Sequence, residues 1–164
     1  MRCRSFLTLL ACCALATSHA QFTDDFSDGD FAIGPAWSGS DALFMVVDDA
    51  GNQRLRSNSA GAANYHLSTP STLVNDVQWE FFFDLRFSTS GANYVDVFLM
   101  SDLTDLSGAV NGYYLRCGGT ADRLELFNSE NGSGFSTGLL SPDGIINSSS
   151  SNPFRIKVTR TTGG

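Results

Sequence analysis

Apolar and polar residues alternate with a period of two along much of the chain after residue 20. The clearest example runs from residue 77 to residue 87, where every second residue is apolar and the residues between are mostly polar. A period of two places successive side chains on opposite faces of a β-strand, so this pattern predicts a half-buried strand. Its expected inward residues are Val77, Trp79, Phe81, Phe83, Leu85 and Phe87.

The same alternation predicts several shorter strands. Residues 43–47 and 53–56 are joined by Asp48-Asp49-Ala50-Gly51-Asn52, whose Asp, Gly and Asn residues tolerate the positive φ of a tight turn. We therefore expect these two strands to form a hairpin. No stretch after Ala20 has the 3.6-residue period of an amphipathic helix. The other predicted strands cover residues 95–99, 113–117, 124–126 and 154–159.

Clusters of Gly, Ser, Asn and Asp separate these short strands, which is typical of an antiparallel sandwich. A parallel sheet would require crossover helices. The serine-rich stretch 147–153 is interpreted as a loop rather than an interdomain linker, because a strong strand follows it directly. Four stretches without large apolar runs are expected to be surface or connecting loops: 57–63, 88–92, 101–111 and 128–151.

The first twenty residues have a different character from the rest of the chain. Arg2 and Arg4 precede a short apolar run, residues 6–16, and the small residues of Ser18-His19-Ala20 follow it. A basic start, an apolar run too short to span a bilayer and a small-residue exit predict a signal peptide, residues 1–20, cleaved before Gln21. The expected location is therefore secreted, either extracellular or at the cell surface, with no membrane span in the mature chain.

Two alternatives for this leader stay open. Residues 1–20 would also suit a buried N-terminal helix. Leu10-Ala11-Cys12 resembles a lipoprotein cleavage site, which would leave an acylated Cys12 at the start of the mature protein.

Removal of the leader makes the chain more acidic. The full sequence has 10 Lys and Arg against 17 Asp and Glu. Without Arg2 and Arg4 the balance is eight against seventeen, a net charge of −9 with His66 neutral. Such an excess of negative charge disfavours nucleic acid and anionic lipid as partners. Cys117 would be the single remaining cysteine, so a hydrophobic core rather than an internal disulfide has to stabilise the fold.

Eight short motifs follow one another along residues 21–164. They are FSDGDF at 26–31, PAWSG at 35–39, LST at 67–69, WEF at 79–81, SD at 101–102, DLSG at 105–108, NGYY at 111–114 and GGTAD at 118–122. In this order they resemble the N-terminal domain of large secreted Bacteroidetes proteins, which often carry a lamin-tail domain further along. The chain departs from that pattern at Cys117, where an aliphatic residue is usual.

The resemblance implies an all-β, antiparallel jelly-roll β-sandwich of the concanavalin-A-like, laminin-G-like kind, and it implies no known activity. It also implies downstream domains in the full-length chain and a further strand after the strand at 154–159. We therefore expect one jelly-roll domain at residues 21–164 that is incomplete at its C-terminus. Without the further strand, the strand at 154–159 or its neighbour would present unpaired backbone groups. A natural end at Gly164 is the alternative.

The sequence predicts no catalytic residue. His66 has no Gly-x-Ser-x-Gly motif nearby, Cys117 occupies an inward strand position, and together they are too few to hold zinc. A jelly-roll glucanase needs carboxyl groups about 5 Å apart, which alternate positions on one strand provide. Glu80 and Asp84 are four residues apart, so about 13 Å separates their Cα atoms. A glycoside hydrolase is therefore the alternative to a non-enzymatic module.

An aspartate-rich segment near the start of the predicted mature chain is the candidate metal site. Carboxylates grouped around a glycine suit Ca²⁺, which prefers hard oxygen ligands. The segment is not an EF-hand, because Phe26 and Pro35 occupy the third and twelfth positions. Either a structural calcium ion or an Asp-rich turn before a strand fits this pattern. The candidate calcium ligands are Asp24, Asp25, Asp28 and Asp30.

A second candidate site lies on the strand faces opposite the expected core. Sugar rings stack on aromatic side chains, while Asp and Arg hydrogen-bond to their hydroxyl groups, so such a face suits a glycan or a cell-surface polysaccharide. Loops that cover a central strand on both sides would produce the same pattern. We expect a binding or spacer module, and a purely structural domain is a further alternative. The candidate carbohydrate-binding residues are Phe82, Tyr94, Asp96, Phe98, Tyr114 and Arg116.

Overall fold

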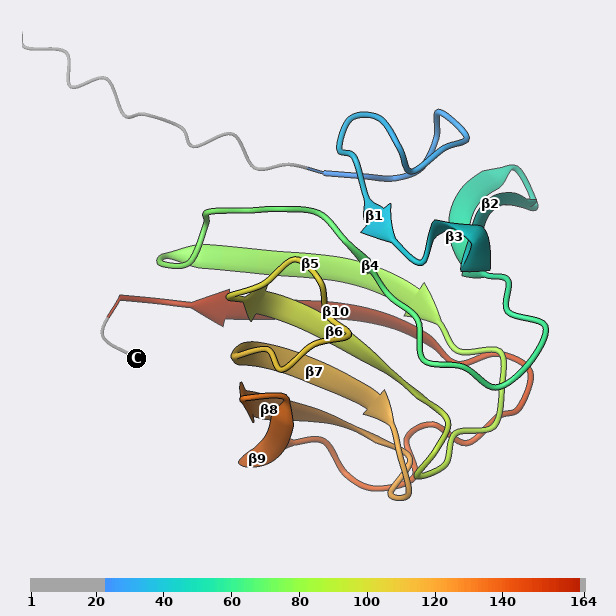
Figure 1. Ribbon diagram of the computed structural model, residues 1–164. Helices are drawn as coiled ribbons and strands as arrows, with labels where there is room; N and C mark the ends of the chain where they lie inside the picture. The colour runs from blue at the N-terminus through green and yellow to red at the C-terminus, as the bar shows by residue number, and fades with distance from the viewer. Residues whose placement is uncertain (1–22, 163–164) are drawn as a thin grey trace, which may run out of the picture.

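The computed structural model describes residues 23–162, so the predicted signal peptide and the alternatives involving Cys12 lie outside the described residues. Within that range the chain forms β-strands and one short 3₁₀ helix, Asp41–Leu43 (Figure 1). No helix in this range is long and apolar enough to cross a membrane. The strands are β1 (Ser38–Gly39), β2 (Phe44–Asp49), β3 (Asn52–Ser57), β4 (Leu67–Ser68), β5 (Val77–Asp84), β6 (Tyr94–Ser101), β7 (Gly112–Gly118), β8 (Arg123–Glu130), β9 (Ser133–Leu140) and β10 (Pro153–Arg160).

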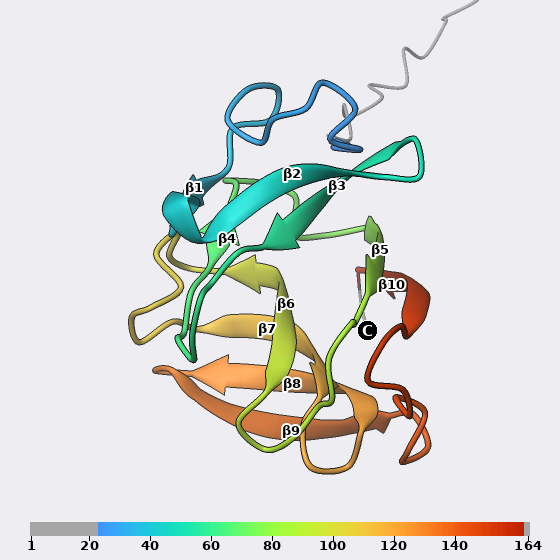
Figure 2. The same cartoon turned by 90° about the vertical axis from the view of Figure 1, so that its right-hand side faces the viewer.

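All strand pairs are antiparallel. The largest sheet has the order β6-β7-β8-β9, and β10-β5, β2-β3 and β1-β4 are two-stranded. Figure 2 shows β5 and β10 beside the four-stranded sheet, with the β2-β3 hairpin across the end nearest β6. The all-β class, the antiparallel pairing and the predicted hairpin are therefore confirmed, and the arrangement is consistent with a β-sandwich.

The core lies between the β10-β5 pair and the four-stranded sheet. Leu115 and Cys117 of β7 are buried there together with Leu85 and Ile146, and inward residues of β5, β6, β8 and β10 pack around them. Residues 77–83 of β5 alternate between partly buried and exposed, as predicted from the period of two. β5 ends at Asp84, but Leu85 still exchanges two backbone hydrogen bonds with Asn152, of 3.1 and 3.0 Å.

The serine-rich stretch is a loop between β9 and β10, and the buried side chain of Asn152 organises it. The Asn152 amide nitrogen donates to the carbonyls of Leu85 and Ser148, at 3.0 and 2.6 Å. Its oxygen accepts from the backbone N–H groups of Asn147 and Ser148, at 3.2 and 3.1 Å. Because one side chain satisfies four backbone groups, a segment rich in serine adopts a defined path without apolar residues.

One strand contradicts the sequence prediction. Residues 128–151 were expected to be a loop, but β9 occupies residues 133–140 and pairs with β8. All eight residues of β9 are exposed. Because the strand buries neither face, its sequence has no alternation of apolar and polar residues from which a strand could be predicted. The overlooked signal is Asn131-Gly132, because both residues have positive φ (50° and 78°) and join Glu130 to Ser133 as a two-residue hairpin turn.

Candidate functional site

Seven side chains share the face of the four-stranded sheet that is opposite the core, and we call them the outer-face cluster. The register places Asp96, Arg116 and Glu125 side by side on β6, β7 and β8. Phe98, Tyr114 and Phe127 form the neighbouring row, each two residues away from the first row on the same strand. The outer-face cluster consists of Tyr94, Asp96, Phe98, Tyr114, Arg116, Glu125 and Phe127.

Arg116 occupies the centre of the outer-face cluster. Its Nε and Nη2 atoms donate to the two carboxylate oxygens of Asp96, at 2.8 and 2.7 Å, so the ion pair is bidentate. The guanidinium carbon lies 3.9 Å from the ring centre of Tyr94 and 5.0 Å from that of Phe127. The hydrogen bonds that Arg116 donates to the Asp96 carboxylate raise the pKa of Arg116, against the opposing effect of burial. The positively charged guanidinium of Arg116 is therefore held in a fixed position on the outer face of the sheet.

Aromatic rings form the rest of this surface. The rings of Tyr114 and Phe127 are stacked, with centroids 5.2 Å apart and planes 5° from parallel, and Phe98 lies 5.0 Å from Tyr114 on the other side. The absence of a side chain at Gly134 of β9 permits this arrangement, because a Cβ there would collide with the Tyr114 hydroxyl. Tyr114 is buried, whereas Tyr94 is 38% exposed, so Tyr94 offers the accessible ring.

Glu125 adds a second carboxylate to the outer-face cluster. It accepts hydrogen bonds from Arg123 Nε and Nη2, at 2.9 and 2.7 Å, and from the Ser136 hydroxyl. Burial opposes ionisation of Glu125, but these hydrogen bonds and the charges of Arg123 and Arg116 outweigh it and lower its pKa. Glu125 is therefore a carboxylate near neutral pH and cannot donate a proton.

The structure brings together five of the six candidate carbohydrate-binding residues, namely Tyr94, Asp96, Phe98, Tyr114 and Arg116. It does not bring Phe82 to them, because Phe82 lies on β5 in the other sheet, where the Arg54 guanidinium lies 5.1 Å from its ring centre. Glu125 and Phe127 also belong to this surface, but they were not among the residues predicted from the sequence. The inward residues Leu124 and Leu126 implied that they point outward, but only the register of β8 places them beside Arg116 and Tyr114.

The four aspartates proposed as calcium ligands do not gather into a metal site. Among residues 23–162 no three His, Cys, Asp or Glu side chains are grouped so that they could hold a metal ion. Asp24, Asp25, Asp28 and Asp30 instead each accept a hydrogen bond from the backbone N–H two residues later. Asp24 also accepts from Trp37 Nε1 at 2.7 Å. The geometry is that of successive Asx turns, the second of the two interpretations.

Groups that are often catalytic have structural surroundings here. His66 directly precedes β4, lies against Gly39 of β1 and has its Nε2 atom 3.6 Å from Asp105 Oδ1. Cys117 is fully buried in the core, and burial raises the pKa of its thiol. Glu80 pairs with Arg155 on the exposed face of β5 and β10, with 2.6 Å between Arg155 Nε and Glu80 Oε1. None of these three residues contributes to the outer-face cluster.

No family model, curated protein or solved structure was found to match the chain. The geometry of the described residues is therefore the basis for a functional proposal.

Proposed function

We propose that this chain is an extracellular, non-enzymatic jelly-roll module that binds a neutral carbohydrate on the outer-face cluster. The observation that carries the proposal is that five residues selected from the sequence for this role share a single sheet face, where Tyr94, Asp96 and Tyr114 lie around the Arg116 guanidinium. Binding sites for small polar ligands combine apolar rings with a few fixed polar groups, and the outer-face cluster has both.

The arrangement suits sugar recognition in two ways. The Arg116 guanidinium covers one face of the Tyr94 ring, and the exposed remainder of Tyr94 provides an apolar surface on which the C–H face of a pyranose can stack. Asp96 occupies two of the five N–H donors of Arg116, which leaves donors for sugar hydroxyl groups, and the Asp96 oxygens retain lone pairs that accept hydrogen bonds. Because Asp96 and Arg116 fix each other, little side-chain entropy is lost when a ligand binds.

Charge favours a neutral ligand over an acidic one. Asp96 balances the charge of Arg116, and Glu125 lies opposite Arg116 in the adjacent strand. The chain also carries a net charge of −7 in its full sequence. A sulfated or uronic-acid polysaccharide would therefore meet an overall repulsive field, whereas a neutral glycan would not.

The electrostatics support binding rather than hydrolysis. A glycosidase needs a carboxylic acid whose pKa is raised, so that it can protonate the leaving oxygen. The pKa of Glu125 is instead lowered, and Asp96 is engaged in a bidentate ion pair. These two observations favour a binding module over a hydrolase. Release of reducing sugar from a bound glycan would instead identify a hydrolase, the alternative function.

A glycan array followed by calorimetric titration tests the proposal. We expect the purified protein to bind at least one neutral glycan and Tyr94→Ala to weaken that binding about tenfold or more, since a central aromatic contact commonly contributes 1–2 kcal/mol or more. Phe82→Ala is the matched control, because Phe82 is also an exposed aromatic residue but lies on the other sheet. No glycan binding, or equal losses in both variants, would refute the proposed site.

A further inference from the structure

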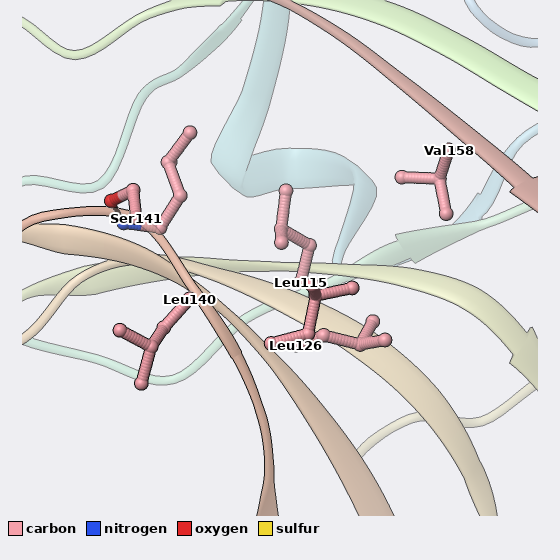
Figure 3. Close-up of a pocket in the computed structure, with 7 residues that line it drawn as sticks. Leu115, Leu126, Leu140, Ser141 and Val158 are labelled. Carbon is pink, nitrogen blue, oxygen red and sulfur yellow. Dashed lines mark hydrogen bonds between the residues drawn. The ribbon is translucent and has the colours of Figure 1, made fainter.

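An uncovered apolar surface lies on the inner side of the four-stranded sheet, away from the outer-face cluster. A cavity of about 300 Å³ opens there between the two main sheets (Figure 3). Leu139 of β9, which lines it, is 67% exposed. Exposed apolar patches of this kind commonly mark interaction sites. The apolar residues around the cavity are Leu115, Leu124, Leu126, Leu139, Leu140 and Val158.

The cavity borders an open strand edge. Val158, one of its lining residues, belongs to β10, and within residues 23–162 β10 pairs with β5 alone. In the described part of the chain β10 is therefore an edge strand over its eight residues, next to leucines that no other strand of this part covers. Figure 2 shows β10 on the side of β5 that faces away from the β2-β3 hairpin.

The hydrogen-bond pattern shows which backbone groups point to the open edge. Leu85 and Asn152 exchange both backbone hydrogen bonds, and the pairing of β5 with β10 continues without a register shift. Hydrogen-bonded and non-hydrogen-bonded pairs alternate along an antiparallel ladder. Phe154, Ile156 and Val158 therefore bond to β5. The N–H and C=O groups that point away from β5 are those of Arg155, Lys157 and Thr159.

The open edge and the cavity together fit one kind of ligand, an extended β-strand. Its backbone would pair with Arg155, Lys157 and Thr159, a stretch of about 17 Å for five residues. On one side, alternate side chains would enter the cavity beside Val158 and Leu126. The side chains between them would lie on the outer side, beside those of Arg155 and Lys157.

Charge indicates what that strand carries on its outer side. Arg155 and Lys157 are exposed basic residues in a protein that is acidic overall; Glu80 of β5 pairs with Arg155, whereas Lys157 has no ion pair within residues 23–162. A second copy of the same edge would place basic residues beside basic residues, which is unfavourable in an antiparallel pair. Acidic residues at these positions would instead form cross-strand ion pairs. We propose that the open edge of β10 and the adjacent cavity dock an extended strand of a partner polypeptide in which apolar and acidic residues alternate.

A synthetic nine-residue peptide that alternates valine with glutamate is the probe, and a peptide that alternates valine with lysine is its control. In protein alone, we expect the amides of Arg155, Lys157 and Thr159 to exchange rapidly with deuterated solvent. Saturating Val/Glu peptide should slow their exchange about tenfold or more, because docking gives these N–H groups hydrogen-bond partners. The Val/Lys peptide should leave the exchange rates unchanged.

Two pairs of variants test the two halves of the site. Lys157→Pro removes an N–H that points away from β5 and should abolish peptide binding, whereas Lys157→Ala keeps that N–H and should weaken binding only a few-fold. Leu139→Glu places a charge at the cavity and should also abolish binding. Ile33→Glu is its control, since Ile33 is equally apolar and 72% exposed but lies in the N-terminal segment. The Leu139 pair decides the question if Lys157→Pro fails to fold.

Five results would overturn the proposal. The three amides could be protected in protein alone, which would mean that the edge is already paired. Both peptides could slow exchange equally, which would indicate unselective apolar contact. Peptide binding could survive Leu139→Glu, or sedimentation could show dimers that dissociate in Lys157→Glu, which would assign the edge to a second copy. Unchanged exchange at millimolar Val/Glu peptide would exclude such a ligand.

Discussion

Arg116 illustrates how single side chains define the surface of this protein. Its guanidinium lies over the Tyr94 ring, is paired with Asp96 and is close to Phe127, so residues of both neighbouring strands, β6 and β8, fix its position. Alternation alone identified the outward direction of Tyr94, Asp96 and Arg116. The nearness of Phe127 could not be predicted, because it depends on how the turn between β7 and β8 sets their register. The separation of Phe82 likewise depends on which sheet β5 joins.

Cys117 provides a prediction at the same scale. It is fully buried, and burial raises the pKa of its thiol. Since the thiolate is the reactive form, the native protein should not react at Cys117 with a thiol reagent at pH 8, and reaction should become rapid in denaturant. Mass spectrometry of the peptide that contains Cys117 measures this directly. Rapid labelling under native conditions would show that the core opens or that β7 has a different register.

At the scale of elements, strands that bury one face were predictable and β9 was not. β5, β6, β7 and β10 have apolar residues at alternate positions, because one face of each packs into the core. β9 contacts its neighbour mainly through backbone pairing, so its sequence is rich in Gly and Ser. Its turn, Asn131-Gly132, was the single local sign of a hairpin. Short bridges such as β1 with β4 depend on contacts distant in sequence and leave no local pattern.

Asp84 links two elements and predicts how stability depends on pH. It accepts hydrogen bonds from Arg86 Nε, the Ser151 hydroxyl and the Asn152 N–H, at 2.6, 3.0 and 2.8 Å. Burial opposes ionisation of Asp84, but these bonds and the charge of Arg86 outweigh it and lower its pKa. A lowered pKa in the folded state stabilises the protein above the unfolded value of about 3.9, and this stability is lost as the pH falls through the folded value.

The variant Asp84→Asn tests this contribution. At pH 7 it should lower the free energy of unfolding by about 1.5–3 kcal/mol, the usual contribution of hydrogen bonds to a charged group. The difference from wild type should shrink as the pH falls below about 4, where Asp84 of the unfolded chain becomes protonated, and it should be lost once the pH has passed the lower pKa of the folded state. Urea unfolding between pH 3 and pH 7 measures both quantities. Asp41→Asn, at an exposed position in the 3₁₀ helix, is the control and should change little. An equal deficit at pH 3 and pH 7 would contradict the assigned role.

At the scale of the whole molecule, the four-stranded sheet uses its two faces differently. The inner face supplies half of the core and, toward β9, an uncovered apolar cavity. The outer face carries charged groups that form ion pairs and aromatic rings that stack on each other and on the Arg116 guanidinium. The sequence predicted the all-β class because alternation is local. It could not predict how far β10 and β5 cover the larger sheet, because that depends on the packing of sheets rather than on any one segment.

Nuclear magnetic resonance titration of the ¹⁵N-labelled protein, with the neutral glycan that binds most strongly on the array, tests most directly whether the outer-face cluster is the ligand site. We expect saturable shifts of the amides of Tyr94, Asp96 and Arg116 and of neighbouring outer-face positions on β8. The amides around Phe82 on β5 and Leu139 on β9 should not move. Saturable shifts centred on the inner cavity or on β5, with the Arg116 region unaffected, would contradict the assignment of the outer-face cluster as the ligand site.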